Sequence, residues 1–221
     1  ALFDGQQYLV EQRVISYTPS ATVLNLCTQK TAKGQGVLLF GYADQQLPAI
    51  EAELATLAQL FPAAELCTGR QAKTKRFMNK VQQHRFVHVA THATFRTDNP
   101  MLSSLSFADR RLTLAEIAQL RLEADLVVLS GCETGKGQLQ GSDLLSLASG
   151  FLGAGARSLL VSLWRVEDTT TAQLMEHFYR AMLAGEQPAV ALQTAKRWLL
   201  NEGRTSTGQR SFYRHPAYWA P

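Results

Sequence analysis

Long apolar runs, cysteines and charged residues are all scarce in this sequence of 221 residues, and each scarcity removes a class of protein. No apolar stretch approaches the roughly 18 residues of a membrane-spanning helix, so we expect no membrane partner. Three cysteines, Cys27, Cys67 and Cys132, are an odd number and do not suggest a disulfide framework. We therefore expect a globular protein of a reducing compartment, and we assign it to the cytoplasm.

The charge pattern argues against a nucleic-acid partner. Lys and Arg number 22 against 18 Asp and Glu, which leaves a net charge of +4. Nucleic-acid-binding proteins usually cluster such charge, whereas here short basic groups occur only at Lys73–Arg76 and Arg110–Arg111. The apolar content of 46% is enough for a sizeable core. We predict a single domain over residues 1–221.

Apolar runs alternate with helical patterns along the chain, which predicts an α/β fold. We expect strands at 37–42, 64–67, 85–91, 126–129 and 157–164, with possible edge strands at 13–17 and 22–26. Helices are expected at 48–62, within 71–83, from Thr113, from Ser142, after Asp168 and from Pro188 to Asn201, with a loop at 202–211 and a small hairpin at 105–112. This order predicts a mainly parallel central sheet flanked by helices on both faces.

Reactive side chains follow two of the expected strands. One strand ends at Thr91 and is followed by His92, and the other ends in Leu129-Ser130-Gly131-Cys132. Ligands of open α/β sheets bind beyond the carboxyl ends of the strands. If the two strands are neighbours, an imidazole and a thiol can face each other there, which is the arrangement that activates a cysteine nucleophile.

Other readings of these residues are weaker. His88 and His92 lie four apart on an expected strand without the Glu of a zinc motif, so we expect no metal ion, and we interpret His88 as a core histidine. The segment from Gly131 to Gly137 lacks the spacing and the Ser or Thr of a phosphate loop, and no cofactor is expected. No Gly-x-Ser-x-Gly elbow supports a serine hydrolase. Cys27 and Cys67 lie in apolar segments and are interpreted as packing residues.

Several of these segments together resemble one family, the CHAT domain, a caspase-like peptidase domain associated with tetratricopeptide repeats. The matching segments occur in the family's order: Phe86–Ala93, Pro100–Ser104, Leu112–Ile117, Ala124–Gly135, Gly141–Asp143, Phe151–Trp164 and His215–Ala220. The resemblance covers roughly residues 10–221. It implies a caspase-like fold and membership of the clan that includes caspases, separases and legumains. The Cys-Glu-Ser-Gly run of legumains is similar to Cys132–Gly135 of this chain.

The resemblance also implies a reaction. His92 and Cys132 occupy the positions of the clan's catalytic His-Cys dyad, and the N–H groups of Ala93 and Cys132 occupy those of its oxyanion hole. Most of the clan has Gly where this chain has Ala93, but an alanine also supplies an N–H group. The implied activity is that of a cysteine endopeptidase acting on a protein substrate.

The caspase pocket positions map onto four residues here. Ser130 precedes the cysteine by two positions, Trp164 and Arg165 match part of the Ser-Trp-Arg run that lines the pocket, and Asp44 lies in the loop after the first strand. Asp44 in the pocket would favour a basic P1 residue, and Arg165 an acidic one. Packing is an equal alternative for Trp164, and Asp168 is interpreted as a helix cap rather than a pocket acid.

One alternative and one further expectation accompany the peptidase prediction. Some caspase-like domains are catalytically silent interaction modules, although such domains tend to lose the Cys or the His. We also expect the chain to be a fragment of a longer multidomain protein, in which a tetratricopeptide-repeat region or a partner protein regulates the domain.

Overall fold

The computed structural model describes residues 2–43, 49–94, 96, 98–130, 149–162, 168–205 and 215–220. The chain divides into two compact units. We call Thr18–Arg165 the sheet unit, and Ala1–Tyr17 together with Val166–Pro221 the helical unit. That the whole chain acts as one domain stays a prediction.

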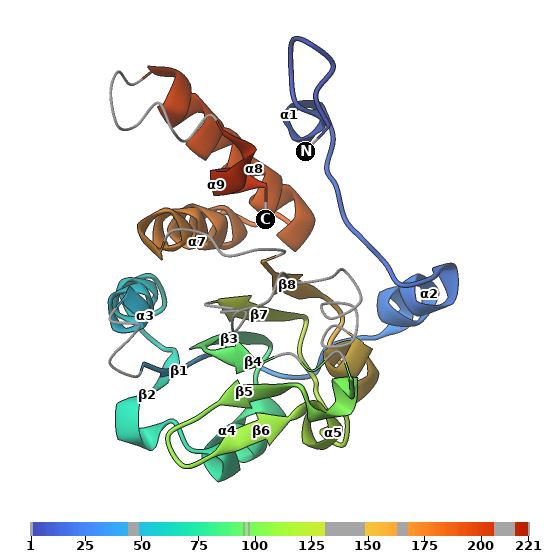
Figure 1. Ribbon diagram of the computed structural model, residues 1–221, viewed down its shortest axis with the longest axis vertical. Coiled ribbons are helices and arrows are strands. Elements are labelled where there is room, and N and C mark those ends of the chain that lie inside the picture. The colour runs from blue at the N-terminus through green and yellow to red at the C-terminus, as the bar shows by residue number, and fades with distance from the viewer. Residues whose placement is uncertain are drawn as a thin grey trace. The chain divides into compact units, whose positions relative to one another are not determined.

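The sheet unit alternates strands and helices, as expected of an α/β protein (Figure 1). Its elements are α2 (Ala21–Gln29), β1 (Val37–Tyr42), α3 (Ala49–Leu60), β2 (Glu65–Thr68), η1 (Gly69–Gln71), α4 (Thr74–Val81), β3 (Phe86–Thr91), β4 (Ala93–Thr94), η2 (Pro100–Leu102), β5 (Ser104–Ser106), β6 (Arg111–Thr113), α5 (Leu114–Ile117), β7 (Leu126–Ser130) and β8 (Leu159–Val161). Residues 149–154 are also helical.

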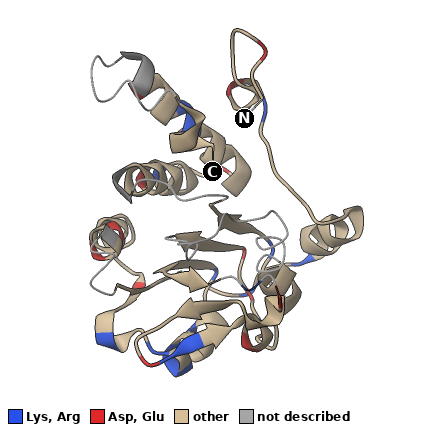
Figure 2. Cartoon of the chain, in the orientation of Figure 1, with Lys and Arg blue, Asp and Glu red and all other residues tan. Residues whose placement is uncertain are grey.

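A five-stranded sheet in the order β2-β1-β3-β7-β8 forms the centre of this unit, and all of its pairings are parallel. The strands β1, β3 and β7 contain no Lys, Arg, Asp or Glu, and Figure 2 shows them in tan. Strands that are covered on both faces need apolar side chains in both directions, which explains why they read as continuous apolar runs. The predicted mainly parallel sheet is confirmed.

Helices pack on both faces of β1. On one face the rings of Phe40, Phe77 of α4 and Phe107 lie with centroids 5.0–5.1 Å apart. On the other face α3 lies so close that a Cβ added to Gly41 would be 2.3 Å from the Leu54 Cδ1 atom. Glycine at this position therefore permits the close approach of α3 to the sheet.

A second, antiparallel sheet in the order β4-β5-β6 follows directly after β3. It contains the small hairpin expected at 105–112. Thr113 and Glu116 form the predicted capping box at the start of α5.

The helical unit is built on α7 (Asp168–Leu183) and α8 (Pro188–Thr205), which pack against each other, with α1 (Leu9–Gln12) and α9 (Pro216–Trp219). The His177 and Trp198 rings stack between α7 and α8 with centroids 3.5 Å apart. The Tyr8 ring packs edge-on against Trp219, which joins the two ends of the unit. No helix in the described part of the chain is both long and apolar enough to cross a membrane.

Four expectations about secondary structure are wrong. Residues 22–26 are not a strand but part of α2, which begins after the capping hydroxyl of Ser20. Residues 13–17 form no strand. The last long helix continues past Asn201 to Thr205, so the expected loop begins later than predicted. Asp168 is the first residue of α7 rather than the residue before it.

Candidate active site

The two strands that precede His92 and Cys132 are direct neighbours in the sheet. β3 pairs with β7 in parallel, with Ala90 opposite Ser130. Parallel strands present their carboxyl ends at the same edge, so the chain leaves β3 toward His92 beside the point where it leaves β7. The sequence left this adjacency open, and the structure shows it. Cys132 lies outside the described residues, as do Asp44, Trp164 and Arg165.

The backbone at His92 is fastened to the antiparallel sheet. The Ser106 N–H donates to the His92 carbonyl oxygen at 2.9 Å. The Thr91 hydroxyl contacts the carbonyl oxygen of Ser106 and also that of Tyr42, the latter at 3.4 Å. His92 itself is half-buried. Its position is thus held by β5 on one side and by the end of β1 on the other.

The backbone N–H of Ala93 is not bonded to the antiparallel sheet. It pairs with Leu105 across β4 and β5, and the bond from Ser106 to His92 makes this a non-hydrogen-bonded pair of the antiparallel ladder. In such a pair the backbone N–H points away from the partner strand. The Ala93 N–H is therefore directed away from β5, while its methyl group is buried.

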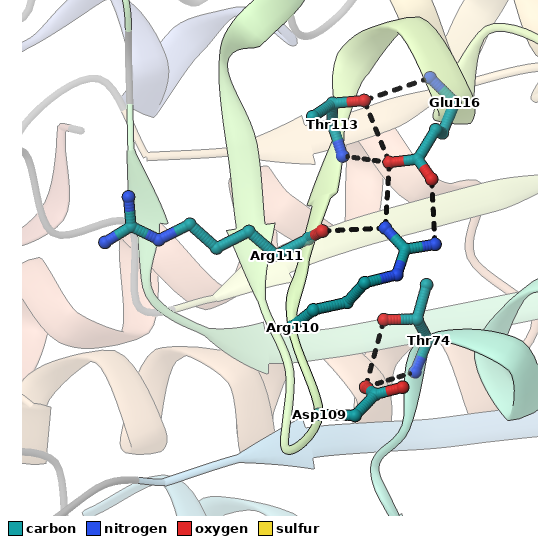
Figure 3. A network of polar contacts seen from close by, with 6 residues as sticks. All are labelled: Thr74, Asp109, Arg110, Arg111, Thr113 and Glu116. Carbon is teal, nitrogen blue, oxygen red and sulfur yellow. Dashed lines mark hydrogen bonds and ion pairs between the residues drawn. The ribbon is translucent and has the colours of Figure 1, made fainter.

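A polar network holds the β5–β6 hairpin in place (Figure 3). Asp109 accepts hydrogen bonds from the Thr74 backbone N–H at 2.8 Å and from the Thr74 hydroxyl at 3.0 Å, and so caps α4. These bonds, the backbone one foremost, lower the pKa of Asp109. The cap connects α4 to the hairpin that carries β5.

Glu116 is the centre of the other half of this network. It accepts from the Thr113 N–H at 2.9 Å and pairs with the Arg110 guanidinium at 2.8 Å. The hydrogen bond from Arg110 is the main reason that the pKa of Glu116 falls to about 2. Together the two halves of the network hold the β5–β6 hairpin, whose strand β5 pairs with β4, the strand after His92.

Ser130 has a partner that the sequence did not reveal. Its hydroxyl donates to Glu53 Oε2 of α3 at 2.9 Å, and the other oxygen of Glu53 lies 3.2 Å from His88 Nε2 of β3. All three side chains are buried. His88 is a core histidine, as predicted. We call Glu53, His88 and Ser130 the buried cluster.

Glu53 was overlooked because it lies within a helix that was interpreted only through its apolar residues. A signal was present, however. Glu53 falls on the inward stripe that also contains Ile50, Leu54 and Leu57, at spacings of three and four residues. A carboxyl group at such a position needs a buried polar partner.

The other two cysteines occupy different environments. Cys67 is completely buried in β2, and burial raises the pKa of its thiol. Cys27 is half-buried in α2. The complete burial of Cys67 agrees with its interpretation as a packing residue. Among the described residues no group of three or more His, Cys, Asp or Glu side chains could hold a metal ion.

Comparison with known proteins adds two findings. The model of the CHAT domain family matches residues 1–221, the whole chain. Tetratricopeptide repeat protein 28 of Mus musculus is 26% identical over 212 residues, which cover 79% of this chain and 8% of that protein. The Homo sapiens protein of the same name is 25% identical with the same coverage. The chain thus spans about 8% of the length of these relatives.

Proposed function

Because this chain belongs to the CHAT domain family, we propose that it is a cysteine endopeptidase that cleaves a protein substrate with His92 and Cys132. The observation that carries the proposal is the pairing of β3 with β7. This pairing is parallel, so the two strands that precede His92 and Cys132 in the sequence end at the same edge of the sheet. The family is related to caspases by the resemblance described above.

The proposed reaction is acyl transfer through a thioester. His92 takes the proton from the Cys132 thiol, and the thiolate attacks the carbonyl carbon of the peptide bond. The negative charge that develops on the carbonyl oxygen is stabilised by the N–H groups of Ala93 and Cys132, each worth roughly 3–4 kcal/mol in comparable sites. The C–N bond then breaks, and the leaving amine receives its proton from His92.

The second half of the reaction restores the enzyme. Water attacks the thioester carbonyl while His92 accepts one of its protons. The C–S bond breaks, the carboxylic acid product leaves, and the sulfur of Cys132 regains a proton. His92 thus acts as base and as acid in turn, which suits an imidazole because its pKa lies near neutrality.

Residues at the caspase pocket positions are proposed to select the substrate. Asp44, Trp164 and Arg165 are proposed pocket residues, with Asp44 favouring basic and Arg165 acidic P1 residues. Cleavage of matched peptides with Arg, Asp or Leu at P1, by the native chain and by Asp44→Asn, separates these roles. A preference for Arg that survives Asp44→Asn unchanged removes Asp44 from the pocket.

A regulator is proposed on similar grounds. The relatives that match are tetratricopeptide repeat proteins by name, and the chain corresponds to a small part of each. We propose that a repeat region or a partner protein delivers the substrate to this domain or controls its activity.

The dyad is tested by substitution and by thiol labelling. Cys132→Ala and His92→Ala should each lower peptide cleavage at least about a hundredfold, whereas the control Cys27→Ala should stay within about twofold of the native chain. Iodoacetamide should alkylate Cys132 much faster than Cys27 or Cys67. Equal alkylation rates together with undetectable cleavage would instead favour a catalytically silent interaction module.

A further inference from the structure

The buried cluster joins three separate elements within the sheet unit. Glu53 comes from α3, His88 from the middle of β3 and Ser130 from the last position of β7. Glu53 Oε2 accepts from the Ser130 hydroxyl at 2.9 Å, and Glu53 Oε1 lies 3.2 Å from His88 Nε2. One carboxyl group therefore contacts both strands that lead to His92 and Cys132.

Stability alone is a poor reason for this arrangement. The exposed fractions are 7% for Glu53, 0% for His88 and 5% for Ser130, so all three polar groups have been removed from water. Removing a carboxyl group from water is costly, and well-packed apolar side chains of similar volume often stabilise a core as well or better. What apolar side chains do not supply is the direction of the hydrogen bond from Ser130 to Glu53, because a hydrogen bond depends on angle and distance whereas apolar contacts tolerate sliding.

Ser130 lies near the end of its strand, where its hydrogen bond can fix the register of β7 against β3. Ser130 is two residues before Cys132, and the residue opposite Ser130 in β3 is Ala90, which is two residues before His92. A shift of β7 against β3 would change the distance between the ends of the two strands. The bond from Ser130 to Glu53, together with the contact of Glu53 with His88, opposes that shift.

The sequence also permits α3 to reach the sheet at this point. Gly41 lies opposite Ala90 in the neighbouring strand, and a Cβ at this position would meet the Leu54 side chain and the Ala90 carbonyl oxygen. Without a side chain at Gly41, α3 approaches closely enough for Glu53 to contact β3 and β7. The close approach and the buried carboxyl group thus occur at the same place.

We propose that Glu53 is a positioning residue for the peptidase reaction: it holds the end of β7 against β3 through Ser130 and His88 and so sets the spacing of Cys132 and His92. This inference rests on the proposed function. Ser130 then serves as the link to Glu53, and it need not touch the substrate as the caspase pattern suggests. The role differs from that of the dyad because Glu53 acts on the reacting groups through other residues.

Two variants test the proposal, with a third as control. Ser130→Ala removes one oxygen and deletes the link. Glu53→Gln keeps an oxygen that can accept from Ser130, so it is the conservative variant. Glu51→Gln changes an exposed carboxylate in the first turn of the same helix and serves as the matched control.

The readouts are kcat, KM and the melting temperature of each purified variant. Ser130→Ala should lower kcat at least about tenfold with KM within about twofold, whereas Glu53→Gln should stay within about threefold of the native kcat. Glu51→Gln should match the native protein in all three. A fall in melting temperature with unchanged kcat would make the buried cluster merely structural, and a change confined to KM would return Ser130 to the pocket; either result overturns the proposal.

Alkylation of Cys132 by iodoacetamide separates this proposal from the proposed function, because labelling needs no substrate. If native Cys132 reacts no faster than Cys67 and no peptide is cleaved, the proposed function fails. If native Cys132 is fast, we expect Ser130→Ala to slow its labelling about tenfold. Equal labelling in native protein and Ser130→Ala overturns the positioning role and leaves the dyad standing.

Discussion

The sheet unit contains two polar clusters, one exposed to water and one buried in the core. The hairpin network of Asp109, Arg110 and Glu116 is largely open to water, and its carboxylates each accept several hydrogen bonds. The buried cluster consists of the Glu53 carboxyl group and the His88 and Ser130 side chains beside it, all three shielded from solvent. Contacts in water are weak and replaceable, whereas a broken contact in the core leaves a polar group with no alternative partner.

Substitutions in the two clusters should therefore differ in how strongly they affect the protein. The hairpin network holds the segment after His92 through many small contributions, so that the loss of one should be tolerated. The buried cluster holds β3 and β7 through few contributions, so that the loss of one should be felt throughout the site.

The largest effect should come from removing the carboxyl group of the buried cluster. Glu53→Ala leaves the Ser130 hydroxyl and the His88 ring without this partner and opens a cavity. We expect a loss of about 3 kcal/mol in the free energy of unfolding, measured by urea denaturation. Glu51→Ala on the exposed side of α3 should change it by less than about 0.5 kcal/mol. Similar values for the two variants would show that burial does not distinguish them.

Moving α3 away from the sheet should have the next largest effect. In Gly41→Ala the new Cβ would lie 2.3 Å from Leu54 Cδ1 and 3.0 Å from the Ala90 carbonyl oxygen. We expect a destabilisation of about 2 kcal/mol in the same assay. Gly153→Ala is the control, because a Cβ there meets no atom within 4 Å and the residue is helical. That control should be neutral or stabilising by up to about 1 kcal/mol, and the prediction fails if the two variants agree.

The cap of α4 represents the hairpin network. Asp109→Ala removes the acceptor of the Thr74 N–H and hydroxyl, and helix caps are worth about 1 kcal/mol. Asp98→Ala, which loses an exposed pairing with Arg96, should cost less than Asp109→Ala. Chemical denaturation of both variants checks this order. A cost for Asp109→Ala as large as that of Glu53→Ala would remove the contrast between the clusters.

The smallest effect concerns the charge of Glu116 and depends on pH. Its pKa is lowered from 4.5 to about 2 in the folded protein, chiefly by the hydrogen bond from Arg110. The stabilisation is therefore fully present above about pH 4.5 and is lost as the pH falls toward 2. Because Glu116 is partly exposed, we expect Glu116→Gln to cost less than about 1 kcal/mol at pH 7.

Measurement at two pH values isolates this charge. The difference in unfolding free energy between native protein and Glu116→Gln should be smaller at pH 3 than at pH 7. The glutamine keeps a side-chain oxygen for the capping box, so the comparison reports the charge rather than the cap. A difference that is the same at both pH values would show that Arg110 does not stabilise the carboxylate.

Local patterns explain which parts of the fold could be predicted. The strands β1, β3 and β7 are apolar runs that admit few other readings, and Thr113 and Glu116 form a capping box within one turn. Residues 22–26 misled the prediction because Thr22 and Val23 favour strands, while the Ser20 hydroxyl bonds to the Val23 N–H and starts a helix. There a cap outweighed β propensity.

The candidate site was predictable only in part. His92 follows from its place after an apolar strand and from the family resemblance, whereas the pairing of its strand with β7 was left open by the sequence. Glu53 does not, because a single carboxyl group on an apolar helical stripe gives no indication of which side chain it will meet. The extension of α8 beyond Asn201 was missed for a related reason, since polar residues are as common at exposed helix ends as in loops.

By itself the sequence determined the five strands of the central sheet and most of the helices between them, because these depend on neighbours within a few positions. The tertiary structure decided the pairings that join distant segments. Ser130 meets Glu53 across 77 positions, and Asp109 caps Thr74 across 35. Such contacts depend on how the crossover helices return the chain to the sheet. The energy of a hydrogen bond does not depend on how far apart in the sequence its two residues lie.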